Sequence, residues 1–69
     1  MHKRFILERV ADPSEVSGIG DVAEGIQFTN GKCVLGWLKI TASVAIYDSI
    51  EALIEVHGHA GSTSVRWID

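Results

Sequence analysis

The chain has 69 residues, of which 46% are hydrophobic, and its formal net charge is −3. A chain this short buries only about 60% of the surface that it exposes when unfolded, so we expect a thin core. The acidic balance argues against binding to a nucleic-acid backbone, which requires a basic face. No run approaches the roughly 18 apolar residues that a membrane-spanning helix needs.

Cys33 is the only cysteine, so no disulfide can form within one chain. A lone cysteine and the lack of an export signal favour a reducing, cytoplasmic setting. The apolar content is high for so small a chain, and small domains often gain stability from subunit contacts. We therefore expect self-association into a homo-oligomer, with part of the apolar surface buried between copies.

The first predicted strand is residues 3–10, where alternation would place Phe5 and Leu7 toward the core. A break at a proline ends this segment, and the loop that follows contains Gly18 and Gly20. Both glycines permit a positive φ or the close approach of another group.

The second and third strands are predicted to form a hairpin. Val22, Ile26 and Phe28 share a parity that is typical of a half-buried strand. Gly25 between them indicates a bulge or tight packing. Asn30-Gly31 then favours a type I′ turn, because both residues tolerate a positive φ.

The return strand is predicted over residues 32–40, with apolar side chains on both parities. This pattern indicates that the core covers one face, while a helix or another subunit covers the other. Residues 44–47 predict a fourth short strand. Asp48 is placed to cap the next helix, and Glu51 follows at the spacing of a capping box.

A helix is predicted after Asp48, with Gly58 placed to end it, and residues 64–68 predict a last strand. The residues expected to share one face of this helix are Ile50, Leu53, Ile54 and His57. The predicted order is β-β-β-β-α-β, which gives a single compact α+β domain over residues 1–69 with one mainly antiparallel sheet. The helix would pack on one face, and the other face would be wet or would pack on a second copy.

The segment His57–Thr63, HGHAGST, concentrates imidazoles, glycines and hydroxyls directly after the helix. With Arg66, it could bind a phosphate through backbone N–H groups, hydroxyls and a guanidinium. The alternative is a simple helix stop and turn, since a helix C-terminus disfavours anions. We assign the candidate ligand site to His57, His59, Gly61, Ser62, Thr63, Arg66, Trp67, Gly18 and Gly20, with the segment 18–21 contributed by a second subunit.

Metal binding is a weaker interpretation of the same segment. His57 and His59 have a His-x-His spacing, and Cys33, Asp21 or Glu24 would complete a site only if folding brought them near. An isolated pair lacks the ligand number that metals need. The alternative is that His57 packs at the edge of the helix face and His59 bonds loop carbonyls, so we predict no metal and no cofactor.

The residue pattern also argues against catalysis. Cys33 lies in an apolar strand, which is typical of an inert buried thiol. Ser62 or Ser64 with a histidine and an aspartate would resemble a triad, but no nucleophile, base and orienting group can be assigned together. We therefore predict that the protein is not an enzyme.

The remaining aromatic and charged residues have simpler interpretations. Trp37, Tyr47 and Trp67 could stack on a base or a peptide, but such residues more often fill a core or an interface. The residues expected to form a solvated charged edge are Glu8, Arg9, Asp12 and Glu15.

Three stretches together give a pattern, VSGxGxVAEG … WL … HGHxGxT … W. They are residues 16–25, residues 36–38, and His57–Thr63 with Arg66 and Trp67. On this pattern the chain resembles a group of short, largely uncharacterised bacterial and phage proteins, and the resemblance covers most of the chain. The group often has Arg before the tryptophan of the third strand, where this chain has Gly36. The resemblance implies a compact single domain and names no substrate.

From these observations we predict a non-enzymatic, homo-oligomeric binding module. The ligand class that suits hydroxyls, imidazoles, Arg66 and an aromatic face is a small phosphorylated molecule such as a nucleotide. The resemblance to phage proteins implies a role in counter-defence, by sequestering a host signalling nucleotide. The competing prediction is a structural or protein-interaction subunit in which the segment 57–63 is only a rigid turn.

Overall fold

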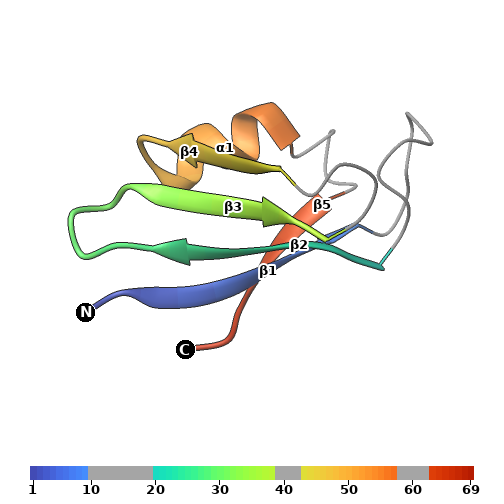
Figure 1. The fold of residues 1–69 in the computed structure, drawn as a ribbon, viewed down its shortest axis with the longest axis horizontal. Coiled ribbons are helices and arrows are strands. Elements are labelled where there is room, and N and C mark those ends of the chain that lie inside the picture. The colour runs from blue at the N-terminus through green and yellow to red at the C-terminus, as the bar shows by residue number, and fades with distance from the viewer. Residues whose placement is uncertain (10–19, 39–42, 58–62) are drawn as a thin grey trace.

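The computed structural model of the chain describes residues 1–9, 20–38, 43–57 and 63–69. Its elements, shown in Figure 1, are β1 (Lys3–Arg9), β2 (Gly20–Gln27), β3 (Cys33–Trp37), β4 (Val44–Tyr47), α1 (Ile50–His57) and β5 (Thr63–Trp67). The predicted order β-β-β-β-α-β and the α+β class are therefore confirmed. The predicted ends at Val10, at residues 39–40 and at Gly58 lie outside the described residues.

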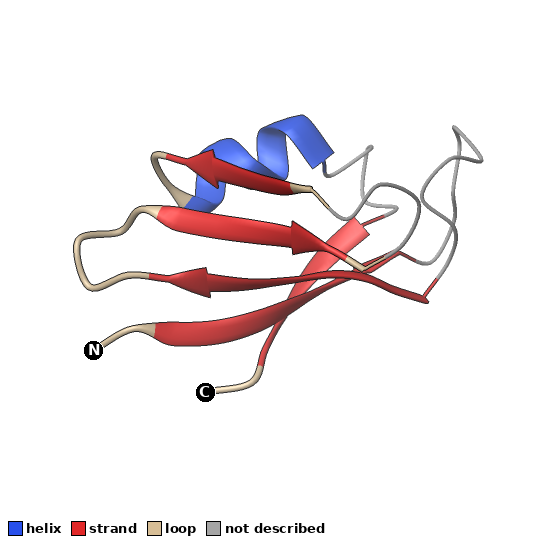
Figure 2. Ribbon diagram, viewed as in Figure 1, coloured by secondary structure: helices blue, strands red, loops and turns tan. Residues whose placement is uncertain are grey.

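The five strands form one sheet in the order β4-β3-β2-β1-β5, and every neighbouring pair is antiparallel. Helix α1 packs on one face and contacts both edge strands, β4 and β5 (Figure 2). A twisted sheet curls around a single helix in this way. We call the side that α1 covers the helix face, and the opposite side the open face.

The hydrophobic core lies between the sheet and α1. Its buried side chains are Phe5, Leu7, Val22, Ala23, Cys33, Leu35 and Leu53. The predicted inward orientation of Phe5 and Leu7 is confirmed. The predicted helix face is only partly right, because Leu53 is fully buried whereas Ile54 remains 45% exposed.

A β-bulge overturns the parity predicted for β2. The register between β1 and β2 shifts between Leu7 and Glu8, and the shift leaves Val22 as an extra residue. A bulge reverses which alternate residues face the core. As a result Val22 is buried, Ile26 lies on the open face, and Phe28 is exposed beyond the strand.

Gly25 is required by tight packing, as the sequence predicted. It pairs with Phe5, and a β-carbon on Gly25 would overlap the buried Phe5 ring. We expect Gly25→Ala to lower the free energy of unfolding by about 1–3 kcal/mol, because the ring cannot move without disturbing the core. Urea denaturation measures this loss. Gly36→Ala is the matched control, since its β-carbon would meet only the Glu24 carbonyl oxygen at 3.7 Å; an equal loss in both variants would contradict the argument.

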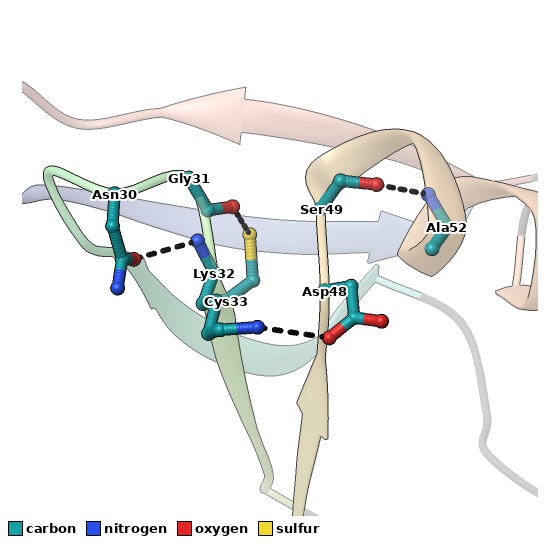
Figure 3. A network of polar contacts seen from close by, with 7 residues as sticks. All are labelled: Asn30, Gly31, Lys32, Cys33, Asp48, Ser49 and Ala52. Carbon is teal, nitrogen blue, oxygen red and sulfur yellow. Dashed lines mark hydrogen bonds and ion pairs between the residues drawn. The ribbon is translucent and has the colours of Figure 1, made fainter.

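The predicted hairpin is present, but its turn is not the two-residue type I′ turn. The Gly31 N–H donates to the Phe28 carbonyl at 2.9 Å, and the Phe28 N–H donates to the Lys32 carbonyl at 2.8 Å. The loop is therefore three residues long, and Gly31 takes the positive φ of +93° at its end. The Asn30 side chain accepts the Lys32 N–H at 3.0 Å, which stabilises this longer turn (Figure 3).

The cap of α1 is Ser49, one residue later than predicted. Its Oγ accepts the Ala52 N–H at 3.1 Å, and its carbonyl accepts the Leu53 N–H at 3.2 Å. Asp48 instead pairs with the Lys32 ammonium group at 3.0 Å, across from the hairpin (Figure 3). Both residues are good N-caps, so the sequence pattern alone does not distinguish them.

Candidate functional site

The candidate site is built on the end of the sheet where β1 ends and β2 and β5 begin. Arg9 pairs with Gly20 of β2 on one side and with Thr63 of β5 on the other. Its Nε donates to the Thr63 Oγ1 at 2.9 Å, and only 1% of Arg9 is exposed. Gly20 has a φ of +93°, which favours glycine at this position. Arg9 thus lies between two of the predicted site residues, Gly20 on β2 and Thr63 on β5.

The buried Arg9 corrects the prediction of a solvated edge. Phe5, Leu7 and Arg9 alternate along β1, so the strand period places all three on the helix face. The buried Thr63 hydroxyl gives the Arg9 guanidinium an acceptor inside the protein. The period of two that predicted Phe5 and Leu7 to face the core continues to Arg9. This alternation could have predicted that Arg9 is buried. Asp12 and Glu15 lie outside the described residues.

His57 ends α1 within a small aromatic cluster. Its Nε2 shares a hydrogen bond with the Tyr47 hydroxyl group, and its ring meets the edges of the Trp37 and Tyr47 rings, with centroids 5.1 and 5.6 Å away. Burial raises the pKa of Tyr47, so the phenol retains its proton at neutral pH. These contacts agree with the alternative prediction that His57 packs at the edge of the helix face. A metal or ligand that used Nε2 would have to displace Tyr47.

Arg66 and Trp67 point to opposite faces, so the structure does not bring them into one pocket. The Arg66 guanidinium lies on the open face between Glu8 at 3.2 Å and Asp21 at 3.1 Å. The Trp67 ring packs on the Phe5 ring on the helix face, at 5.4 Å between centroids. The Asp21 contact forms within one chain, so it needs no second subunit.

The two carboxylates paired with Arg66 affect how well an anion could bind to this guanidinium. All three side chains remain partly exposed, and pairs of this kind contribute at most about 1 kcal/mol each because water screens them. A phosphate, which accepts several charge-assisted hydrogen bonds, could take the place of one carboxylate. Repulsion from the other carboxylate would oppose it, so Arg66 needs further donors around the ligand.

Four predicted site residues lie outside the described residues: His59, Gly61, Ser62 and Gly18. Among the residues that are described, no three His, Cys, Asp or Glu side chains gather closely enough to hold a metal ion. Within the same ranges, no helix is long and apolar enough to cross a bilayer.

Cys33 has the environment of a structural thiol. It is buried in the core, and its Sγ lies 3.6 Å from the Gly31 carbonyl oxygen (Figure 3). Burial, assisted by the nearby Glu51 carboxylate, raises the pKa of Cys33. A thiol with a raised pKa carries little thiolate at neutral pH, and the thiolate is the nucleophile and metal ligand.

Comparison with known proteins places the chain in a family. No curated protein and no solved structure matches it significantly. A family model described as Acb5 phage protein matches residues 2–69, which is nearly the whole chain. This supports the predicted resemblance to a group of short phage proteins. The protein belongs to the Acb5 family of phage proteins.

Proposed function

We propose that the protein is a non-enzymatic, homo-oligomeric binding module that sequesters a phosphorylated small molecule of nucleotide type through the segment 57–63. Membership of a phage family supports a role in counter-defence, in which the module withdraws a signalling nucleotide of the host. Arg66 supplies a positive charge to the phosphate, while the hydroxyls and backbone N–H groups of the segment supply further donors.

The observation that carries this proposal is that both ends of the segment are anchored. His57 is held by Tyr47 at the end of α1, and Thr63 is held by the buried Arg9 at the start of β5. Only five residues separate these two anchors. A segment with anchored ends loses less conformational entropy when it binds a ligand, which favours binding.

The proposal that the module is not an enzyme is supported by the residues available for chemistry. The Cys33 thiol is buried with a raised pKa, and Tyr47 occupies Nε2 of His57. Nucleophilic catalysis requires a nucleophile and a base within hydrogen-bonding reach, with a third group orienting the base. A sequestering protein releases its ligand unchanged, so recovery of intact nucleotide after prolonged incubation tests this part.

The binding test compares Arg66→Gln with the wild-type protein by calorimetric titration of a panel of linear and cyclic ribonucleotides. We expect the wild type to bind a member of the panel, and Arg66→Gln to weaken that binding at least about tenfold, because a charge-assisted hydrogen bond is lost. Lys32→Gln is the matched control. It removes an exposed cation that pairs with Asp48 beside the hairpin, far along the sheet from Arg66.

Two outcomes would contradict the nucleotide proposal. One is binding of the matching nucleosides as tightly as the nucleotides, since a phosphate site requires the phosphate. The other is a protein that binds no member of the panel although it is folded. That result would favour the second candidate, a structural or protein-interaction subunit. The open face of the sheet supports this candidate, because Val44 and Ile46 are largely exposed on it.

A further inference from the structure

We propose that the open face of the sheet is the surface through which two copies of the chain associate. The inference deepens the homo-oligomer of the proposed function by naming its interface. The interface lies on the same face as Arg66, whose strand position pairs with Ile6 of β1. Its central feature is a row of side chains that crosses all strands on the side opposite α1.

The row follows directly from the strand register. Ile46 of β4 pairs with Val34 of β3, which pairs with Ile26 of β2, which pairs with Arg4 of β1. Ile68 continues the row just beyond β5, where its N–H donates to the Arg4 carbonyl at 2.9 Å. Four of these five positions are aliphatic, on a face that α1 does not cover. Such a mostly apolar row on an exposed sheet face is typical of an interaction surface.

The open face combines a hollow with a projecting edge. The hollow, of about 340 Å³, is lined by Ile26, Val34 and Ile68 and lies over two positions without side chains, Gly25 and Gly36. Beside it, on the edge strand β4, Val44 is 68% exposed and Ile46 is 74% exposed. An isologous contact uses the same patch on both copies, so a face that carries both a hollow and a projection can complement itself.

The open face carries both a positive and a negative side chain. This mixture favours a second copy of the chain over a partner that is purely acidic or purely basic. Arg4 and Glu24 both line the hollow, on the neighbouring strands β1 and β2. Arg4 uses Nε and Nη2 for Asp69, and a guanidinium has further N–H donors. A copy related by a two-fold axis presents a carboxylate and a guanidinium in return, so opposite charges can meet across the contact.

The size of the face suits a dimer of modest affinity. Five strands spaced about 4.8 Å apart, each about six residues long at about 3.3 Å per residue, cover roughly 480 Å². Because the sheet curls around α1, two such faces bury at most roughly 1,000 Å² together, which is the lower limit for a specific interface. We therefore expect association at micromolar concentration, with the sheets packed face to face.

The test uses sedimentation velocity on the full chain across a micromolar concentration series. We expect the wild type to sediment with twice the 7.5 kDa mass of the chain, and Ile46→Glu to sediment as a monomer. Val56→Glu is the matched control, because Val56 is an exposed aliphatic residue on α1. Circular dichroism confirms that each variant is folded.

A second variant keeps the test decisive if Ile46→Glu does not fold. Gly36→Arg would fill the hollow, and its β-carbon has only an ordinary contact within the chain. We expect this variant to be a folded monomer. A monomeric wild type would overturn both this inference and the homo-oligomer of the proposed function. An oligomer that persists in the folded open-face variants would overturn this inference alone, and titration of the nucleotide panel into the same variants reports the ligand site separately.

Discussion

Leu53→Ala is expected to unfold a large fraction of the protein at ordinary temperature. Leu53 is the one side chain of α1 that is fully buried, and it joins the helix to the sheet core. Truncating a buried leucine costs about 2–5 kcal/mol, through lost burial and the cavity that remains. A domain of this length has a stability of only about 3–5 kcal/mol, so the loss is comparable with the whole. Urea denaturation followed by tryptophan fluorescence measures it.

Ile54→Ala is the matched control for this prediction. It removes an aliphatic side chain from the next position of the same helix, and alanine is a better helix former than isoleucine. Because Ile54 is 45% exposed, we expect a loss below about 1 kcal/mol. If the two variants were equally stable, α1 would not be held by its packing on the sheet. The anchor of the segment 57–63 at His57 would then lose its support.

The order of elements was predictable because each strand and the helix carries its own periodic pattern. Phe5 and Leu7 recur at the spacing of a strand, and Leu53 recurs with Ile50 and His57 at helical spacing. The structure places the four apolar members of this set in the core or packed against it. The periodicity of one segment reflects the directions of its own side chains. It therefore does not depend on which strand the segment pairs with.

The predictions that were wrong concern positions where the local sequence permits more than one structure. Asp48 and Ser49 are both good caps, and in the structure Ser49 caps α1 while Asp48 pairs with Lys32. The bulge at Val22 depends on how β1 and β2 pair, which no single segment specifies. The buried Arg9 was missed because an arginine is usually exposed, and the Thr63 hydroxyl that accepts its Nε–H comes from β5, late in the chain.

The sequence identified the segment of the candidate site, but it did not show which of the predicted residues lie together in the structure. The sequence neighbours Arg66 and Trp67 lie on opposite faces, because successive residues of a strand alternate. Conversely, Gly20 and Thr63 are distant in sequence, and antiparallel pairing places them on either side of Arg9. Tertiary contacts between strands therefore decide which predicted residues can act together.

Thr63→Val is the second substitution for which we expect a large effect. Valine has nearly the shape of threonine but removes the hydroxyl that accepts the buried Arg9 Nε–H. Leaving a buried charged donor without this acceptor costs about 1.5–3 kcal/mol. Thr63→Ser retains the hydroxyl and should cost less than about 1 kcal/mol. Urea denaturation of both variants measures the difference.

The same hydrogen bond should link stability to ligand binding, because Thr63 is one anchor of the segment 57–63. A double-mutant cycle with Arg9→Met isolates the Arg9–Thr63 interaction from whatever else each side chain contacts. We expect a coupling of about 1–2 kcal/mol in the free energy of unfolding. If Thr63→Val also weakens nucleotide binding while Thr63→Ser does not, the anchored end of the segment contributes to the site. Additive losses in the cycle would instead show that Arg9 and Thr63 stabilise the fold independently, and the argument from an anchored segment would lose one of its two supports.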